Sequence, residues 1–273
     1  MLAIKNNIMA ANAARYMGQS YDALAKSIER LSSGLRINSA KDDAAGLAVR
    51  ELMRADIAVI QQGARNAQDG ISMLQTMEGA MATIDELLIR MSQLAEQAVT
   101  ESYSAAQKLI MNDEFNEMRE EIDRIAGATK FNEIAMLNSA GATITIQFGE
   151  LTTDKVEIAT GNLTSASQGL NLTNLSITGT SSAQTALTRL DAAIGLKDTA
   201  RARFGYKMNR LESTISVLNI SAENLMAAES RLSDVDVATE MANMTRNQVL
   251  AQAGTAMLAQ ANAMPQMALT LLR

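Results

Sequence analysis

The chain has 273 residues, a formal net charge of -6 at pH 7, and no cysteine, histidine or tryptophan. A Ser-His-Asp triad, a cysteine nucleophile and the common zinc sites are excluded, because each needs one of the missing side chains. The negative charge argues against nucleic acid as a partner, since a phosphate backbone calls for a basic patch.

The first residues do not have the pattern of a secretory signal. Lys5 is the only charged side chain before Arg15, and the intervening NNIMAANAA is too polar for an apolar signal core. No run of about 18 apolar residues occurs in the chain, so we expect no membrane span. The absence of cysteine excludes disulfides but does not fix the compartment.

Residues 2 to 43 are expected to begin with an amphipathic helix. Gly34 is expected at its C-cap. The S-x-x-[DE] spacing of Ser39 and Asp42 predicts that a new helix begins near Asp43. The apolar stripe of the first helix consists of Ile4, Ile8, Leu24, Ile28, Leu31 and Leu35.

Two further helices follow, each with an apolar seam. The seam of the first has the three-and-four spacing of a coiled coil. Its glycines at 46, 63 and 70 each weaken the helix by about 1 kcal/mol relative to alanine, so packing must compensate. Ser104 and Gln107 form a capping box for the second helix, which Gly127 is expected to close. The seams are Leu74, Met77, Met81, Ile84, Leu88, Met91, Ala95 and Ala98, and then Met111, Phe115, Met118, Ile122 and Ile125.

The middle of the chain changes to Thr, Ser, Gly and Asn. Residues 142–148 and 154–160 alternate with the period of strands and predict a hairpin. Leu170, Leu172, Leu175 and Ile177 offer a weaker second set of strand positions. The hydroxyl-rich residues 161–182 are typical of a solvated loop.

A return helix completes a predicted antiparallel bundle of three seams. Its methionines are interpreted as core residues and not as a cofactor site. The return seam is Phe204, Met208, Leu211, Ile215, Leu218, Ala222, Leu225 and Leu232.

The last 44 residues or so predict a helix that stays apolar to its end, and such an end needs a partner. Pro265 predicts a kink or a helix end just before it. The apolar residues expected to drive association are Leu250, Met257, Leu258, Leu269, Leu271 and Leu272.

Three segments resemble bacterial flagellin, the subunit of the flagellar filament: Leu31 to Val49, Glu121 to Leu137, and Met241 to Arg273. The resemblance implies a mainly α fold, a long antiparallel helical bundle or coiled coil with a small β-hairpin region, whose terminal helices pair in the filament. It implies filament-core segments at 1–42 and 233–273, bundle segments at 43–139 and 183–232, and a short surface region at 140–182. No large outer domain fits between them.

The implied function is structural: a homopolymer used for motility, located in the extracellular flagellum. Export unfolded through the flagellar type III system, an export chaperone, a cap protein and O-glycosylation of residues 161–182 are further implications. The family's contacts with Toll-like receptor 5 match Arg90, Leu94, Gln97 and Glu114. Arg90, Leu94 and Gln97 share one helical stripe, in which Arg90 flanks a leucine expected to be exposed. The alternative for the same stripe, favoured as its native role, is packing against the next subunit of the filament.

Other readings remain open. A hook-filament junction protein would share the terminal helices, and an intracellular coiled-coil module would use its seams to recruit a partner helix. An enzyme is the least favoured class, and no catalytic residue or cofactor is expected. The apolar ends also predict that the termini of an isolated subunit are disordered until assembly covers them.

Overall fold

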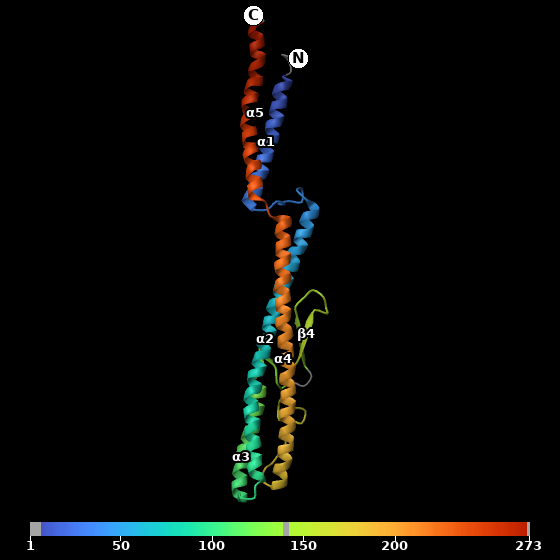
Figure 1. The fold of residues 1–273 in the computed structure, drawn as a ribbon, viewed down its shortest axis with the longest axis vertical. Coiled ribbons are helices and arrows are strands. Elements are labelled where there is room, and N and C mark those ends of the chain that lie inside the picture. Colours follow the sequence, from blue (N-terminus) through green and yellow to red (C-terminus); the bar gives the residue numbers. More distant parts are fainter. Residues whose placement is uncertain (1–6, 139–141, 272–273) are drawn as a thin grey trace. The chain divides into compact units, whose positions relative to one another are not determined.

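The computed structural model describes residues 7–138 and 142–271. Its helices are α1 (Ile8–Ser33), α2 (Ala44–Val99), α3 (Ala105–Ala128), α4 (Thr180–Ser233) and α5 (Val237–Leu271) (Figure 1). Its strands are β1 (Lys130–Phe131), β2 (Ile134–Ala135), β3 (Thr143–Gln147) and β4 (Lys155–Ala159). The mainly α fold with a small hairpin region is confirmed. Within the described ranges, no helix combines the length and apolarity needed to cross a membrane.

The chain forms two compact units. The first contains Met1–Ile57 and Glu223–Arg273, and the second contains Ala58–Ala222. In the first unit, α1 and α5 lie side by side (Figure 1). The expected pairing of the two terminal helices is therefore present within one chain.

Both ends of α1 are capped, and the cap at Gly34 was predicted. The Asn7 side-chain oxygen accepts a hydrogen bond from the backbone N–H of Ala10 at 3.0 Å, which satisfies a donor that the first turn leaves free. At the other end Gly34 has φ 73°, and its N–H donates to the carbonyl of Arg30 at 2.9 Å. A left-handed residue after the last turn favours glycine, so the C-cap at Gly34 is confirmed.

The start of α2 lies where expected, but a different residue caps it. Asp42 accepts hydrogen bonds from the backbone N–H and the hydroxyl of Ser39 at 3.2 and 3.1 Å, which closes a turn. Asp43 caps α2, because its carboxylate accepts from the N–H of Gly46 at 2.8 Å. The prediction that Ser39 and Asp42 open the helix is wrong, since the same spacing also suits an isolated turn.

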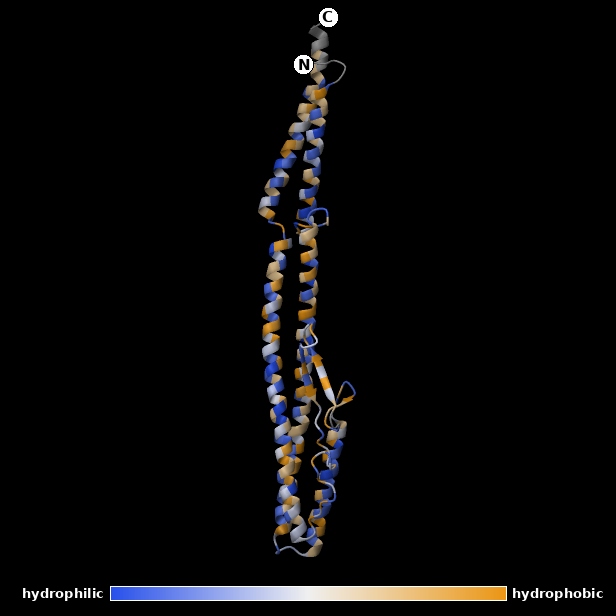
Figure 2. Ribbon diagram, turned by 90° about the vertical axis from the view of Figure 1, so that its right-hand side faces the viewer, coloured by the Kyte–Doolittle hydropathy of each residue, from blue (hydrophilic) through white to orange (hydrophobic). Residues whose placement is uncertain are grey.

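The second unit has a core between α2, α3 and α4. α3 and α4 both run antiparallel to α2 (Figures 1 and 2). Phe115 and Ile122 of α3 and Leu211 of α4 are fully buried, and Met208 and Ile215 of α4 are partly buried against the same hydrophobic core. The three predicted seams meet here. The α2 seam is fully buried at Leu74, Met77, Met81, Ile84, Leu88, Met91, Ala95 and Ala98.

α3 does not end at Gly127. The helix continues to Ala128, and the N–H of Thr129 donates to the carbonyl of Ile125 at 3.0 Å. Gly127 therefore lies inside the last turn, and the predicted closure there is wrong. The chain next turns tightly between β1 and β2 through Asn132 and Glu133, whose φ values are 47° and 65°. Hairpins of this length favour positive φ at both central residues, which asparagine tolerates well.

The predicted hairpin of residues 142–148 and 154–160 is confirmed as β3 and β4. The strands are antiparallel, with Ile144 opposite Ile158 and Ile146 opposite Val156. A Cβ added to Gly70 would lie 3.2 Å from Ile146, so this glycine faces the hairpin closely. Packing against the hairpin thus compensates for a weak position in α2.

The segment after β4 is anchored and not strand-forming. Leu170, Leu172, Leu175 and Ile177 are buried, yet no strand occurs between residues 161 and 179. Asp123 of α3 accepts from the backbone N–H and hydroxyl of Ser165 at 2.7 and 2.6 Å. The prediction of a second strand set is wrong, because local turns and α3 side chains satisfy this backbone while its leucines face the core. The segment is a loop, but the prediction that it is solvated is wrong for these buried residues.

α5 does not end before Pro265. The helix runs without interruption to Leu271. The helix end predicted at Pro265 is therefore wrong, and the kink remains a prediction. A proline inside a helix has no N–H for the carbonyl four residues earlier, so its tolerance needs a physical reason.

Candidate assembly surface

The terminal helix pair, α1 with α5, is the candidate assembly surface. The predicted association residues divide into three groups. Leu24, Leu31 and Leu258 are half-buried. Ile4, Leu269, Leu271 and Leu272 lie outside the residues whose side chains the structure describes. The exposed group comprises Ile8 (67%), Ile28 (51%), Leu250 (49%) and Met257 (63%).

Further apolar side chains of the pair are exposed that the stripe prediction omitted. Apolar and polar residues are intermixed along both helices (Figure 2), and the apolar residues of α5 are spread around its circumference. A helix that is apolar on several faces needs cover on several faces. The spread of apolar residues around α5 is visible in the sequence and could have predicted these additional exposed residues. The additional residues are Met9, Tyr16, Tyr21, Val237, Met241, Val249 and Met267.

Small residues bring the two helices close together. Ala251 of α5 is 3% exposed. A Cβ added to Gly254 would lie 3.2 Å from the Cβ of Met17 in α1. The close approach leaves little apolar surface between the helices uncovered, so the exposed residues above face outward from the pair.

Asn7 connects the ends of the pair. Its side-chain nitrogen donates to the carbonyl oxygen of Ala261 at 2.8 Å. The same side chain caps α1 through its oxygen. Asn7 therefore caps the first turn of α1 and also binds the backbone in the interior of α5.

At the other end of the pair lies the junction, defined as residues 34–43 and 233–236. Its two segments are joined by an antiparallel bridge between Leu35 and Asp234. The N–H of Arg36 donates to the carbonyl of Ser233 at 2.6 Å, and the N–H of Val235 donates to the carbonyl of Gly34 at 3.0 Å. Backbone hydrogen bonds thus tie the two connecting segments together.

Charged side chains fix the junction to the neighbouring helices. Lys26 of α1 forms an ion pair with Asp42 at 2.6 Å. The hydrogen bond from Lys26 lowers the pKa of Asp42 to about 2, and the hydrogen bonds from Ser39 add to the effect. Arg50 of α2 is 8% exposed and donates to the carbonyl of Ile37 at 2.9 Å.

Ion pairs also join the helices of the second unit. Lys197 of α4 is 2% exposed and binds Asp85 of α2 and its own neighbour Asp198. Burial acts to lower the pKa of Lys197, but the hydrogen bonds from the two aspartates outweigh it and raise the pKa. Arg201 pairs with Glu78 at 3.2 Å one turn further along.

The predicted receptor contacts divide between surface and core. Arg90 binds Glu114 of α3 at 2.9 Å, and Gln97 is exposed on the same helix as Arg90. Leu94 is only 2% exposed. The expectation of an exposed leucine beside Arg90 is therefore wrong, because α2 packs against both α3 and α4 and buries a wider stripe than one seam.

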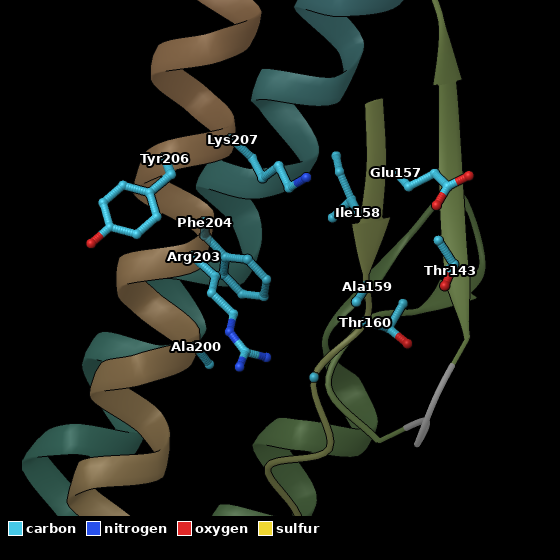
Figure 3. Close-up of a pocket in the computed structure, with 11 residues that line it drawn as sticks. Thr143, Glu157, Ile158, Ala159, Thr160, Ala200, Arg203, Phe204, Tyr206 and Lys207 are labelled. Carbon is cyan, nitrogen blue, oxygen red and sulfur yellow. The ribbon is translucent and has the colours of Figure 1, made fainter. Parts of the chain in front are cut away.

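A groove lies between β4 and α4 (Figure 3). The buried Phe204 lies in it, beside Arg203, Lys207 and Glu157. A hydrogen bond from Lys155 lowers the pKa of Glu157. In the part of the chain that the structure describes, no group of three acidic, histidine or cysteine side chains could hold a metal ion.

Comparison with known proteins covers nearly the whole chain. The models of the bacterial flagellin N-terminal and C-terminal helical regions match residues 4–142 and 187–272. A flagellin of Halalkalibacterium halodurans is 43% identical over 270 residues, which is 99% of each chain. A flagellar filament 33 kDa core protein of Treponema phagedenis is 39% identical, again over 99% of each chain. A flagellin of Bacillus subtilis is 37% identical with the same coverage.

Solved structures agree with these relatives. The crystal structure of Bacillus cereus flagellin matches with a TM-score of 0.51 and 32% identity, over 60% of this chain and 94% of that chain. A putative flagellar hook-associated protein from Vibrio parahaemolyticus has a TM-score of 0.60 at 12% identity, over 71% of this chain and 100% of that one. At that identity the second likeness concerns the fold alone. The full-length relatives and both family models place the chain in the bacterial flagellin family.

Proposed function

We propose that this chain is the structural subunit of a bacterial flagellar filament and has no enzymatic role. The observation that carries the proposal is the apolar surface of the terminal helix pair, which persists after the two helices have packed on each other. Ile8 and Met257 are 67% and 63% exposed. Full burial of one such side chain is worth about 1.5–3 kcal/mol, so several together favour association.

Copies of the same chain are the proposed cover for this surface. A contact between two different patches of identical subunits generates a helical filament when its rotation does not close into a ring. The isolated subunit then has incompletely covered terminal helices, which supports the proposal that its ends become fully ordered during assembly.

The proposed location is the outside of the cell, reached by export of the unfolded chain through the flagellar type III system. An export chaperone that covers the terminal helices and a cap protein at the growing end are the proposed accessory partners. Family membership supports each of these steps. The chain is expected in filaments sheared from intact cells, whereas an intracellular coiled-coil module would remain in the cell pellet.

The segment after β4 has both buried and exposed hydroxyls, which limits where O-glycosylation could occur. Ser165 is buried and bound to Asp123, while Ser167 and Thr178 are exposed. O-glycosylation would therefore attach at exposed hydroxyls such as these two and not at Ser165. The intact mass of protein from sheared filaments decides between a glycan and a bare loop.

Polymerisation of the purified chain tests the main proposal. Heat-dissociated protein is cooled, supplied with short filament seeds and examined by electron microscopy and sedimentation. Long filaments that grow until a fixed soluble concentration remains support a filament subunit. A chain that stops at short caps on the seeds would instead support a hook-filament junction protein, and a chain that never sediments would contradict both.

A further inference from the structure

Pro265 leaves one carbonyl in the interior of α5 without its ordinary donor. In an α-helix the carbonyl of residue 261 accepts from the N–H of residue 265. Residue 265 is the single proline of the chain and has no N–H. The helix nevertheless continues to Leu271. The carbonyl of Ala261 therefore needs another donor.

Asn7 supplies that donor from the other terminal helix. Its Nδ2 donates to the Ala261 carbonyl oxygen at 2.8 Å. Its Oδ1 accepts from the N–H of Ala10 at 3.0 Å. Asparagine has one acceptor and one donor group on the same short side chain, so it fills both roles at once. Serine could accept at the cap, but its hydroxyl is too short to occupy both positions.

We propose that Asn7 is a positioning residue that sets the register of α1 against α5 by replacing the hydrogen bond that Pro265 cannot make. The carbonyls elsewhere in the interior of α5 are already paired with N–H groups of their own helix. A slide of one turn would carry Asn7 about 5.4 Å away from the Ala261 carbonyl, which has no helical donor of its own. The acceptor created by Pro265 is therefore specific to one register.

Two contacts further along the pair agree with that register. Met17 meets Gly254 at the distance of close packing. Arg30 and Glu240 form an ion pair at 3.6 Å near the junction. From Asn7 through Met17 to Arg30 the partners in α5 follow in reverse order, as antiparallel helices require. The consequence for assembly rests on the proposed function, because a shifted register would rearrange the apolar surface of the pair.

A double-mutant cycle tests the inference in the full-length chain. The variants are Asn7→Ser, Pro265→Ala and the two combined. Serine keeps the cap and removes the donor, and alanine at 265 restores the helical N–H for Ala261. We expect Asn7→Ser to raise the critical concentration for polymerisation about threefold to tenfold, the effect of one hydrogen bond. In the Pro265→Ala background the same change should have an effect below about twofold.

A second experiment measures the register of α1 against α5 directly, without polymerisation. Because the chain has no cysteine, Met17→Cys with Gly254→Cys introduces a single pair, placed near the distance that a disulfide needs. Its intramolecular disulfide should form readily in the otherwise unmodified soluble chain. It should form less readily with Asn7→Ser, with Pro265→Ala and with both, because each change removes the bond that selects one register. Asn12→Ser, at an exposed position of α1, is the matched control and should change neither reading.

The outcomes separate the two proposals. Equal effects of Asn7→Ser in both backgrounds would mean that Asn7 acts only as a cap, and no effect in either would mean that the bond to Ala261 is unimportant. Both results overturn the register role. If the disulfide responds to the variants as expected but the unmodified chain forms no filament, the register role is supported and the proposed function is refuted.

Discussion

The carbonyl oxygen of Phe148, at the end of β3, lies against the position where a side chain on Gly63 of α2 would stand. A Cβ added to Gly63 would meet that oxygen at 2.1 Å. Nearby, the side-chain nitrogen of Asn66 donates to the carbonyl of Gln147 at 2.9 Å. The hairpin therefore lies on α2 at a distance that only glycine permits.

Gly63→Ala should destabilise the second unit. The added methyl group would push the hairpin off α2, and such overpacking costs about 1–3 kcal/mol. Gly79→Ala in the same helix is the matched control, because Gly79 is exposed with nothing within 4 Å of an added Cβ. That control should gain up to about 1 kcal/mol from helix propensity. Thermal unfolding followed by circular dichroism measures both, and equal shifts would contradict the close approach.

The buried ammonium of Lys197 predicts an asymmetry between two substitutions. Asp85→Ala leaves this cation buried with only Asp198 as a partner, which should lower the free energy of unfolding by about 1–3 kcal/mol. Lys197→Met removes the cation and keeps its volume, while the Asp85 side chain, 27% exposed, still reaches water. Lys197→Met should therefore lower the free energy of unfolding by less than Asp85→Ala does. Urea denaturation compares the two, and a larger loss for Lys197→Met would refute the interpretation.

The ion pair of Lys26 with Asp42 predicts a pH dependence in acid. Asp42 has a pKa of about 2 in the folded chain, against an ordinary value of 3.8. Between these two pKa values the unfolded chain binds more protons than the folded chain. The contribution of the Asp42 carboxylate to stability is therefore complete above about pH 4 and is lost as the pH falls towards about 2. An NMR titration of the Asp42 carboxyl measures the pKa directly.

Lys26→Met is the matched variant for this titration. Without the ammonium the pKa of Asp42 should rise towards its ordinary value, although the hydrogen bonds from Ser39 remain. The same pKa in both chains would show that Lys26 does not hold the carboxylate.

Recognition by Toll-like receptor 5 stays a prediction and concerns the exposed residues of the original set. Arg90→Ala or Gln97→Ala should lower receptor activation by soluble subunit about tenfold if either is an interface anchor. Arg124→Ala is the control, because Arg124 is also exposed and paired with a glutamate. Activation that is unchanged by both test variants would reject the assignment. Leu94→Ala is unsuitable, since a cavity at this buried leucine would itself cost about 2–5 kcal/mol.

The features that the sequence predicted well are those with a regular period. The α2 seam from Leu74 to Ala98 follows three-and-four spacing, and β3 and β4 alternate, so both could be placed before their partners were known. The close contact at Gly63 was indicated by the glycine alone, without the identity of its neighbour. Hydrophobic periodicity predicts which face of a helix or strand is buried, but it does not predict which element packs against that face.

The missed features depend on contacts between distant residues. Leu94 lies beside the seam, and its burial follows from α2 having two neighbouring helices. The Asn7 contact with Ala261 joins two ends of the chain, and neither residue has an unusual local pattern. The local sequence predicts a helix end at Pro265, because the donor that compensates for the missing N–H lies next to another helix. Such long-range hydrogen bonds have no local sequence signal.

The most direct test of the central account is the removal of α5 alone. A chain that ends at Asp236 keeps α4 and the bridge between Leu35 and Asp234, but loses the terminal helix pair. Electron microscopy of this chain with filament seeds, beside the full-length protein, should show filaments from the full-length protein only. The bundle of the truncated chain should still unfold cooperatively by circular dichroism. Filaments formed by the truncated chain would contradict the claim that the terminal helix pair drives assembly.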